Sequence, residues 1–110
     1  MARKSGDWTF LSNHGHVLIA LSTAPDARIR DIAEMVGLTE RAIHRLLRDM
    51  ESGGIITRKR RGRRVTYSID RDRRLRHPIE SHRTVGDLVS IFERQLEAAR
   101  LPAEDRRFRA

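Results

Sequence analysis

Long hydrogen-bond donors recur at helical spacing in the middle of the chain. Arg41, Arg45 and Arg48 are three or four residues apart, and His44 lies between them. On a helix with 3.6 residues per turn, these four side chains and Glu40 share an arc of roughly 140°, away from the apolar residues of the segment. A guanidinium forks onto guanine O6 and N7 or onto phosphate oxygens, and a histidine donates to a base or a phosphate. These residues predict a helix that offers one side to a nucleic acid.

A second group of cations follows between positions 58 and 64. It spans the middle of an expected β-hairpin, with strands from Ile55 to Arg60 and from Arg64 to Ile69 and a tip at 61–63. Val65 and Tyr67 alternate with polar residues, so one face of the hairpin is expected to rest on helices. Such guanidinium groups suit a narrow minor groove or flanking phosphates, whereas protection of an edge strand needs only one or two charges. The cations are Arg58, Lys59, Arg60, Arg61, Arg63 and Arg64.

Neighbouring elements must position these cations. The segment from Ile29 to Val36 has apolar residues at helical spacing and ends at Gly37, which permits an abrupt turn. We expect the cationic helix to begin at Thr39, whose hydroxyl can accept an early helical N–H. It should end at Gly53-Gly54, which can supply a left-handed residue. Two short helices joined so tightly cross at a steep angle, as in a helix-turn-helix.

The net charge of +8 is concentrated in one region. Residues 41–76 hold thirteen Lys or Arg against four Asp or Glu, a balance of +9, and the other 74 residues have a balance of −1. Arginine makes up 21 of the 23 basic residues, which coding bias alone can produce, but such bias does not explain the clustering. The clustering predicts a surface on which phosphates are neutralised.

The stretch from Ile29 to Ile69, with its Gly-Leu-Thr turn at 37–39 and its Gly-Ile-Ile entry to the hairpin at 54–56, resembles winged helix-turn-helix regulators of the MarR and ArsR type. The resemblance implies a mainly α fold with a small β-hairpin, the wing, and double-stranded DNA as partner. It places Arg41, Ala42, His44 and Arg45 at base edges and the wing arginines on the backbone. The helix cap Thr39 and Arg48, which lies one turn further along the helix, are added to these positions. The expected DNA-binding residues are therefore Thr39, Arg41, Ala42, His44, Arg45, Arg48, Arg58, Lys59, Arg60, Arg61, Arg63 and Arg64.

The chain also departs from both groups. It has no cysteine, whereas ArsR-type metal sensors place paired cysteines around the helix-turn-helix. It is shorter than most MarR-type proteins, which devote more helix to dimerisation and to a ligand cleft. The resemblance therefore implies no particular effector ligand.

The chain is expected to divide at the end of the hairpin. Residues 8–69 form the winged helix-turn-helix domain, 70–83 a charged connector, 84–100 a C-terminal amphipathic helix and 101–110 a frayed tail. A first helix near Asn13 to Ser22 is apolar enough to be core. Just before it, Trp8, Phe10 and Leu11 are expected to cover that core rather than a partner subunit.

The C-terminal helix is expected to mediate dimerisation. Its apolar residues share one stripe, which must be buried either within the monomer or against a second subunit. We favour a homodimer. Its two copies of the cationic helix that begins at Thr39, the recognition helices, would lie roughly one DNA turn apart on a pseudo-palindromic site. The expected dimerisation residues are Val85, Leu88, Val89, Phe92 and Leu96.

Other functional classes find little support in the residues. There is no glycine-rich phosphate loop, no G-x-S-x-G, no H-E-x-x-H and no cysteine nucleophile, so we expect neither an enzyme nor a cofactor. The pairs His14/His16 and His77/His82 lack a strong metal-ligand spacing. No membrane segment is evident, and a cytoplasmic protein is expected. Two alternatives remain, a winged-helix protein-interaction module and a non-specific architectural or RNA-binding protein.

Overall fold

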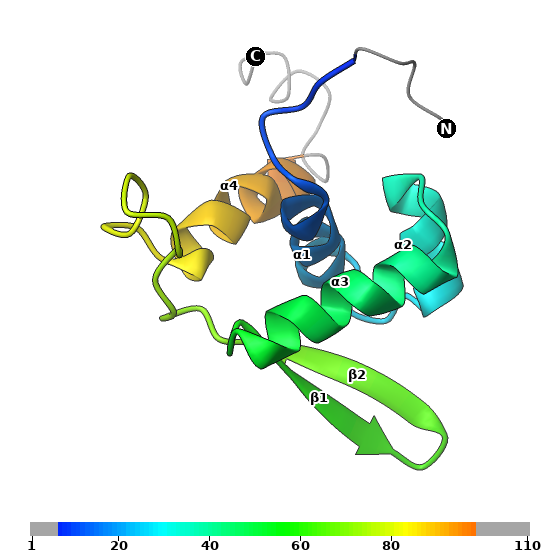
Figure 1. Ribbon diagram of the computed structural model, residues 1–110. Coiled ribbons are helices and arrows are strands. Elements are labelled where there is room, and N and C mark those ends of the chain that lie inside the picture. Colours follow the sequence, from blue (N-terminus) through cyan, green and yellow to red (C-terminus); the bar gives the residue numbers. More distant parts are fainter. Residues whose placement is uncertain (1–6, 99–110) are drawn as a thin grey trace. The chain divides into compact units, whose positions relative to one another are not determined.

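The structure is a computed structural model that describes residues 7–98, with side chains described through Glu93. It divides into two compact units, one up to Asp70 and one from Arg71. The first unit contains the helices α1 (Asn13–Thr23), α2 (Ile29–Val36) and α3 (Glu40–Ser52), followed by the strands β1 (Ile56–Arg61) and β2 (Arg64–Ile69). The second contains α4 (Val85–Ala98) (Figure 1). The mainly helical fold with a small β-hairpin confirms the predicted fold class.

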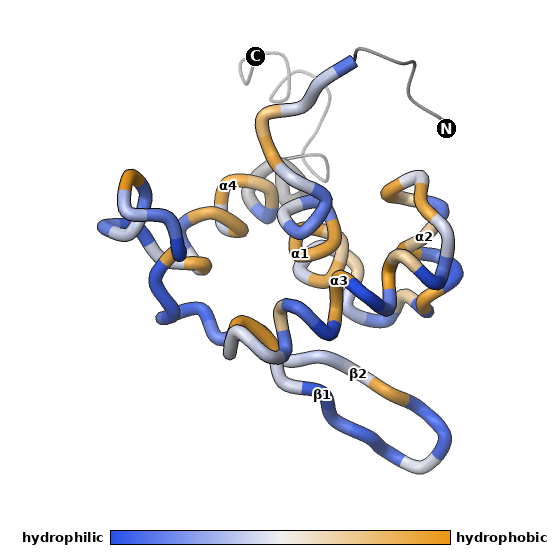
Figure 2. The backbone as a smooth tube through the Cα atoms, in the orientation of Figure 1, coloured by the Kyte–Doolittle hydropathy of each residue, from blue (hydrophilic) through white to orange (hydrophobic). Residues whose placement is uncertain are grey.

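The core of the first unit is made by the three helices and the base of the hairpin. The inward residues of α2 and α3 follow the predicted helical spacing, and apolar colour in Figure 2 is concentrated on the helices, whereas most of β1 is hydrophilic. A Val, Leu, Ile or Met side chain stabilises the fold by about 1.5–3 kcal/mol when it is fully buried. The first helix is core, as predicted. The buried residues are Val17, Leu18, Ala20, Leu21, Ile32, Ala33, Ile43, Leu46, Leu47, Met50, Ile55 and Ile56.

The turn between α2 and α3 forms as predicted. Gly37 adopts the left-handed conformation, with φ of 83°, and its N–H donates to the Ala33 carbonyl over 2.8 Å. Two residues later the Thr39 hydroxyl accepts the Ala42 N–H over 3.1 Å, which caps the first turn of α3. This cap satisfies a backbone donor that the helix itself leaves unpaired.

The wing begins one residue later than predicted. Ile55 still donates its N–H to the Met50 carbonyl at the end of α3, over 2.9 Å, so the first strand starts at Ile56. The left-handed residue at this end of α3 is Gly54, with φ of 77°. The two antiparallel strands run in register from the pair Ile56 and Ile69 to the pair Arg61 and Arg64 at the tip.

The aromatic residues before α1 differ from the prediction. Trp8 and Phe10 are 73% and 92% exposed, so the expectation that they cover the core is wrong. Their segment precedes the first helix, and the core-facing positions of α1 begin only at Val17. The two rings instead contact each other edge to face, with centroids 4.9 Å apart, while Leu11 is half-buried.

In the second unit, an ordered loop leads into α4. Thr84 and Asp87 form a reciprocal cap, in which each side chain accepts the backbone N–H of the other over 3.0–3.1 Å. The hydrogen bond that the Asp87 carboxylate accepts from the Thr84 backbone lowers the pKa of Asp87, and the Thr84 side chain and the positive charge of Arg83 add to this effect. Gly86 donates to the Arg71 carbonyl over 2.9 Å, and a Cβ atom at position 86 would lie 2.9 Å from that oxygen. Only glycine permits this approach.

α4 is described from Val85 to Ala98, so the last two residues of the helix predicted over 84–100 are not tested. Residues 99–110, including the predicted frayed tail, and the side chain of Leu96 lie outside the described part of the chain. Among the described helices, none is long and apolar enough to cross a membrane.

Candidate nucleic-acid interface

The helix α3 separates apolar and cationic residues onto different faces. Arg41, His44, Arg45 and Arg48 are exposed, as the spacing predicted. The opposite side of the helix is buried, which fixes these four residues relative to the core. Ala42 lies between the two faces and is half-buried. Three cations and a histidine thus share one accessible helical surface.

An ion pair that the sequence did not suggest connects α3 to α1. His14 Nε2 lies 2.9 Å from Asp49 Oδ2, next to the cationic face. The hydrogen bond from His14 lowers the pKa of Asp49, and the positive charges of His14, Arg45 and Arg48 add to this effect. The partners are 35 residues apart, so no local spacing could have revealed the pair.

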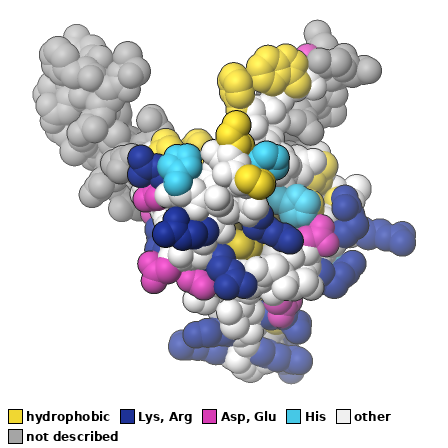
Figure 3. All heavy atoms as spheres, turned by 60° about the vertical axis from the view of Figure 1, so that its left-hand side comes forward, with side chains coloured by type: hydrophobic (Ala, Val, Ile, Leu, Met, Phe, Trp, Pro, Cys, Tyr) yellow, Lys and Arg dark blue, Asp and Glu magenta, His cyan; other side chains and the backbone are white. Residues whose placement is uncertain are grey.

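The wing distributes its cations over both faces of the hairpin. Arg58 pairs with Tyr67 across the strands and Lys59 with Thr66, and successive residues of a strand point to opposite faces. All residues of β1 after Ile56 are exposed. The space-filling view shows Lys and Arg side chains crowded at the lower end, where the wing lies (Figure 3). The wing therefore presents positive charge in more than one direction.

Two of the predicted DNA-binding arginines already have partners within the first unit. Arg64 Nη2 donates to the Asp26 carbonyl over 2.6 Å and lies 3.9 Å from its carboxylate, which connects β2 to the loop after α1. Arg60 Nε donates to the Gly62 carbonyl over 3.1 Å and stiffens the tip, where Gly62 has φ of 61°. Both guanidinium groups keep further donors, because each has five N–H bonds. Their assignment to DNA stays a prediction.

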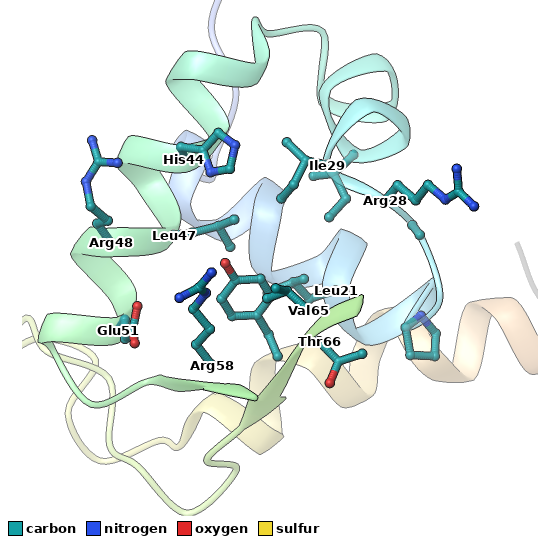
Figure 4. Close-up of a pocket in the computed structure, with 14 residues that line it drawn as sticks. Leu21, Arg28, Ile29, His44, Leu47, Arg48, Glu51, Arg58, Val65 and Thr66 are labelled. Carbon is teal, nitrogen blue, oxygen red and sulfur yellow. The ribbon is translucent and has the colours of Figure 1, made fainter. Parts of the chain in front are cut away.

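A cleft of about 420 Å³ lies between α3 and the wing. Its floor is apolar, and its only acidic lining residue is Glu51. In Figure 4 Arg58 points into the cleft, while Arg48 points away from it along the outer side of α3. Cations from the helix and from the wing thus line the same concave surface, Arg48 on one side and Arg58 on the other. The sequence grouped the cations but did not reveal the cleft, because the walls of the cleft come from five separate elements, α1, α2, α3, β1 and β2. Its lining residues include Leu21, Ile29, Ile32, His44, Leu47, Arg48, Glu51, Arg58, Val65 and Tyr67.

Within the part of the chain that the structure describes, no group of three His, Asp or Glu side chains could hold a metal ion. No buried side-chain nitrogen or oxygen lacks a hydrogen-bond partner in the same residues. What the described surface offers is an array of donors around a cleft, which suits an extended anion.

A family model described as winged helix-turn-helix DNA-binding matches residues 12–57. The chain contains a winged helix-turn-helix DNA-binding domain. The match runs from α1 through α3 to the first residues of β1, and the hairpin that follows completes the wing. The sequence-based assignment of the fold and of DNA binding is therefore confirmed.

Solved structures share the winged helix-turn-helix fold. A predicted DNA-binding transcriptional regulator from E. coli is 21% identical over 73% of each chain, with a TM-score of 0.51. MepR, a transcription regulator of the Staphylococcus aureus multidrug efflux pump MepA, is 23% identical over 86% of this chain and 67% of its own, with the same score. ZitR, a zinc-responsive MarR family member from Lactococcus lactis, is 12% identical over 98% of this chain and 74% of its own, again with a TM-score of 0.51. No curated protein matches the chain.

The expected dimerisation residues of α4 differ in accessibility. Val85 and Val89 are buried within the single chain, so they have little surface left to offer a second subunit. Leu88 and Phe92 are half-buried, and Ile91, which was not among the expected residues, is 53% exposed. Dimerisation through α4 stays a prediction that now rests on these three side chains.

Proposed function

We propose that the protein is a transcriptional regulator that binds a specific sequence of double-stranded DNA. The observation that carries the proposal is that α3 and the wing both place exposed cations around one cleft, within a winged helix-turn-helix DNA-binding domain. In this arrangement α3 enters the major groove and the wing follows the backbone or the adjacent minor groove. We assign the protein no catalytic step and place it in the cytoplasm with the DNA.

In this proposal α3 reads the bases and the wing contacts the DNA backbone. Arg41 and Arg45 fork onto guanine O6 and N7, and His44 donates to an adjacent base or phosphate. Ala42 offers only a methyl group, which suits a close approach to a base edge. The wing cations fix the register through the phosphates and carry little sequence information. Arg58, which points into the cleft, would hold the backbone between helix and wing.

We further propose that the regulator acts as a homodimer. The exposed Ile91 and the half-buried Leu88 and Phe92 of α4 supply the apolar surface for a twofold contact. Two recognition helices about 34 Å apart would then read a pseudo-palindromic site.

Selection of binding sites from a random double-stranded DNA pool tests the proposal. An enriched inverted repeat would support both the specific regulator and the dimer, and light scattering on the bound complex would give its subunit count. Equal binding to all sequences with a steep salt dependence would instead indicate an architectural protein. Absence of binding would favour a protein-interaction module.

A further inference from the structure

The loop between the wing and α4 is closed at its base. Arg74 and Thr84 form an antiparallel bridge, and Leu75 donates its N–H to the Arg83 carbonyl over 2.9 Å. Val85 donates to the Arg73 carbonyl over 2.8 Å and extends this pairing by one step. Residues 74–84, which we call the basic loop, therefore begin and end at one place within the second unit (Figure 1). Compact surface loops of this length with adjoining ends are frequently functional.

Hydrogen bonds also order the interior of the basic loop. Glu80 donates its N–H to the His77 carbonyl, and Arg83 to the Glu80 carbonyl, both over 2.9 Å. The N–H of Ile79 donates to His77 Nδ1 over 3.1 Å, so a neutral His77 ring carries its proton on Nε2 and keeps an N–H donor there. Ile79, close to the tip, is 81% exposed. The loop is thus held in one shape while its tip remains open to solvent.

The basic loop carries more positive than negative charge. It contains three arginines, Arg74, Arg76 and Arg83, against the single acid Glu80, and two histidines in addition. Arg74 donates to the Ser81 carbonyl over 3.1 Å, and Arg83 lies 4.0 Å from Asp87. Arg76 and His82 are exposed, and neither has a hydrogen-bond or ion-pair partner among the described residues. An ordered loop with an uncommitted arginine and further N–H donors fits a polyanion, because the cost of ordering the loop does not fall on binding.

We propose that the basic loop is a second DNA contact, which binds backbone phosphates in the duplex that flanks the recognised site. The inference rests on the proposed function. Only residues 70–73 separate the end of β2 from the bridge at Arg74, and five steps of extended chain span at most about 17 Å. A duplex held by the wing extends over a longer distance than this in both directions, so its flanks come within reach. Arg76 is the principal donor of the contact, with His77 and His82 beside it.

The test compares two duplexes, one ending at the selected site and one extended by about ten base pairs on each side. The full chain binds each duplex over a salt series, followed by fluorescence anisotropy of labelled DNA. Loss of one phosphate contact makes the slope of log affinity against log salt shallower by about 0.9. Between 50 and 200 mM salt, the affinity of the variant should therefore fall about 3.5-fold less than that of the wild type. We expect Arg76→Ala to show this loss on the long duplex and not on the short one.

The matched variant is Glu80→Gln, which removes a negative charge from the loop where Arg76→Ala removes a positive one. Its side chain is exposed, and its backbone hydrogen bonds remain, so circular dichroism should show an unchanged fold. Removal of this negative charge should strengthen binding to the long duplex alone. The proposal is overturned if Arg76→Ala leaves the salt slope on the long duplex unchanged, or if either variant affects the two duplexes equally. Wild-type protein that binds neither duplex would overturn the proposed function itself, a result distinct from either of these.

Discussion

Helix α3 and the wing carry the same kind of side chain but support it differently. The cations of α3 project from a helix whose opposite face is buried, with Ile43 and Leu47 almost inaccessible. The cations of β1 lie on a two-stranded hairpin that is buried only at Ile56. Reading a base edge needs a side chain placed to within a fraction of an ångström, whereas a phosphate can be met by a mobile charge. The packing beneath a cation, more than its residue type, therefore distinguishes base readout from backbone contact.

The largest effect should follow from removing the support of α3. Leu47 is 2% exposed and joins α3 to the core, so Leu47→Ala should lower the free energy of unfolding by about 2–5 kcal/mol. Urea unfolding followed by far-UV circular dichroism measures this change. Arg61→Ala, at the exposed end of β1, is the control and should change stability by less than about 0.5 kcal/mol. Equal losses in the two variants would contradict the difference in support.

The next effect concerns DNA. Arg45→Ala should cost about 1–3 kcal/mol on the selected site and relax the base preference at one position, because a bidentate base contact is lost. Arg61→Ala should instead weaken all sequences alike and reduce the salt slope by about 0.9. Titrations of both variants on the selected and a scrambled duplex distinguish these outcomes. If both variants lose the same affinity on the selected and the scrambled duplex, the assignment of base readout to α3 and of backbone contact to the wing is wrong.

A smaller effect should come from the cap of α3. Thr39→Ala removes the acceptor for the Ala42 N–H and should destabilise the domain by about 0.5–2 kcal/mol. Thr39→Ser keeps the hydroxyl and should retain most of the stability. Thermal unfolding of both variants measures the difference. A loss in Thr39→Ser as large as in Thr39→Ala would show that the methyl group, and not the cap, is what matters.

The smallest effect should be a dependence on pH from the His14–Asp49 pair. Because the pKa of Asp49 is lowered in the folded state, its contribution is fully present above the ordinary carboxyl pKa of 3.8 and is lost as the pH falls below it. Asp49→Asn should therefore be less stable than wild type at neutral pH. Unfolding measured between pH 2 and 6 should show the difference shrinking on the acid side. A difference that does not change with pH would exclude the charge of Asp49 as its source.

Predictions from the sequence succeeded where an interaction acts over one turn of chain. The cap at Thr39, the turn at Gly37 and the two faces of α3 all follow from neighbours within four residues. The shift of β1 by one residue has an equally local cause, because Ile55 is still bonded to the end of α3, but spacing alone did not show it.

Contacts between distant segments could not be predicted in this way. Asp26 and Arg64 are 38 residues apart, and nothing in the spacing of either residue marks the other. The burial of Trp8 was predicted from its apolar character alone, which cannot reveal whether another element will cover it. The cleft has the same difficulty, since only the folded arrangement of its walls creates it.

The exposed pair of Trp8 and Phe10 determines what tryptophan fluorescence can report. Trp8 is the only tryptophan, and at 73% exposure its indole already lies largely in water in the native state. Its emission should therefore change little when the helical core melts, so a fluorescence denaturation curve would underestimate unfolding. The same exposure makes Trp8 an intrinsic probe of binding to the segment before α1. Any molecule that covers this segment would shift the emission of Trp8 to the blue, so no added label is needed.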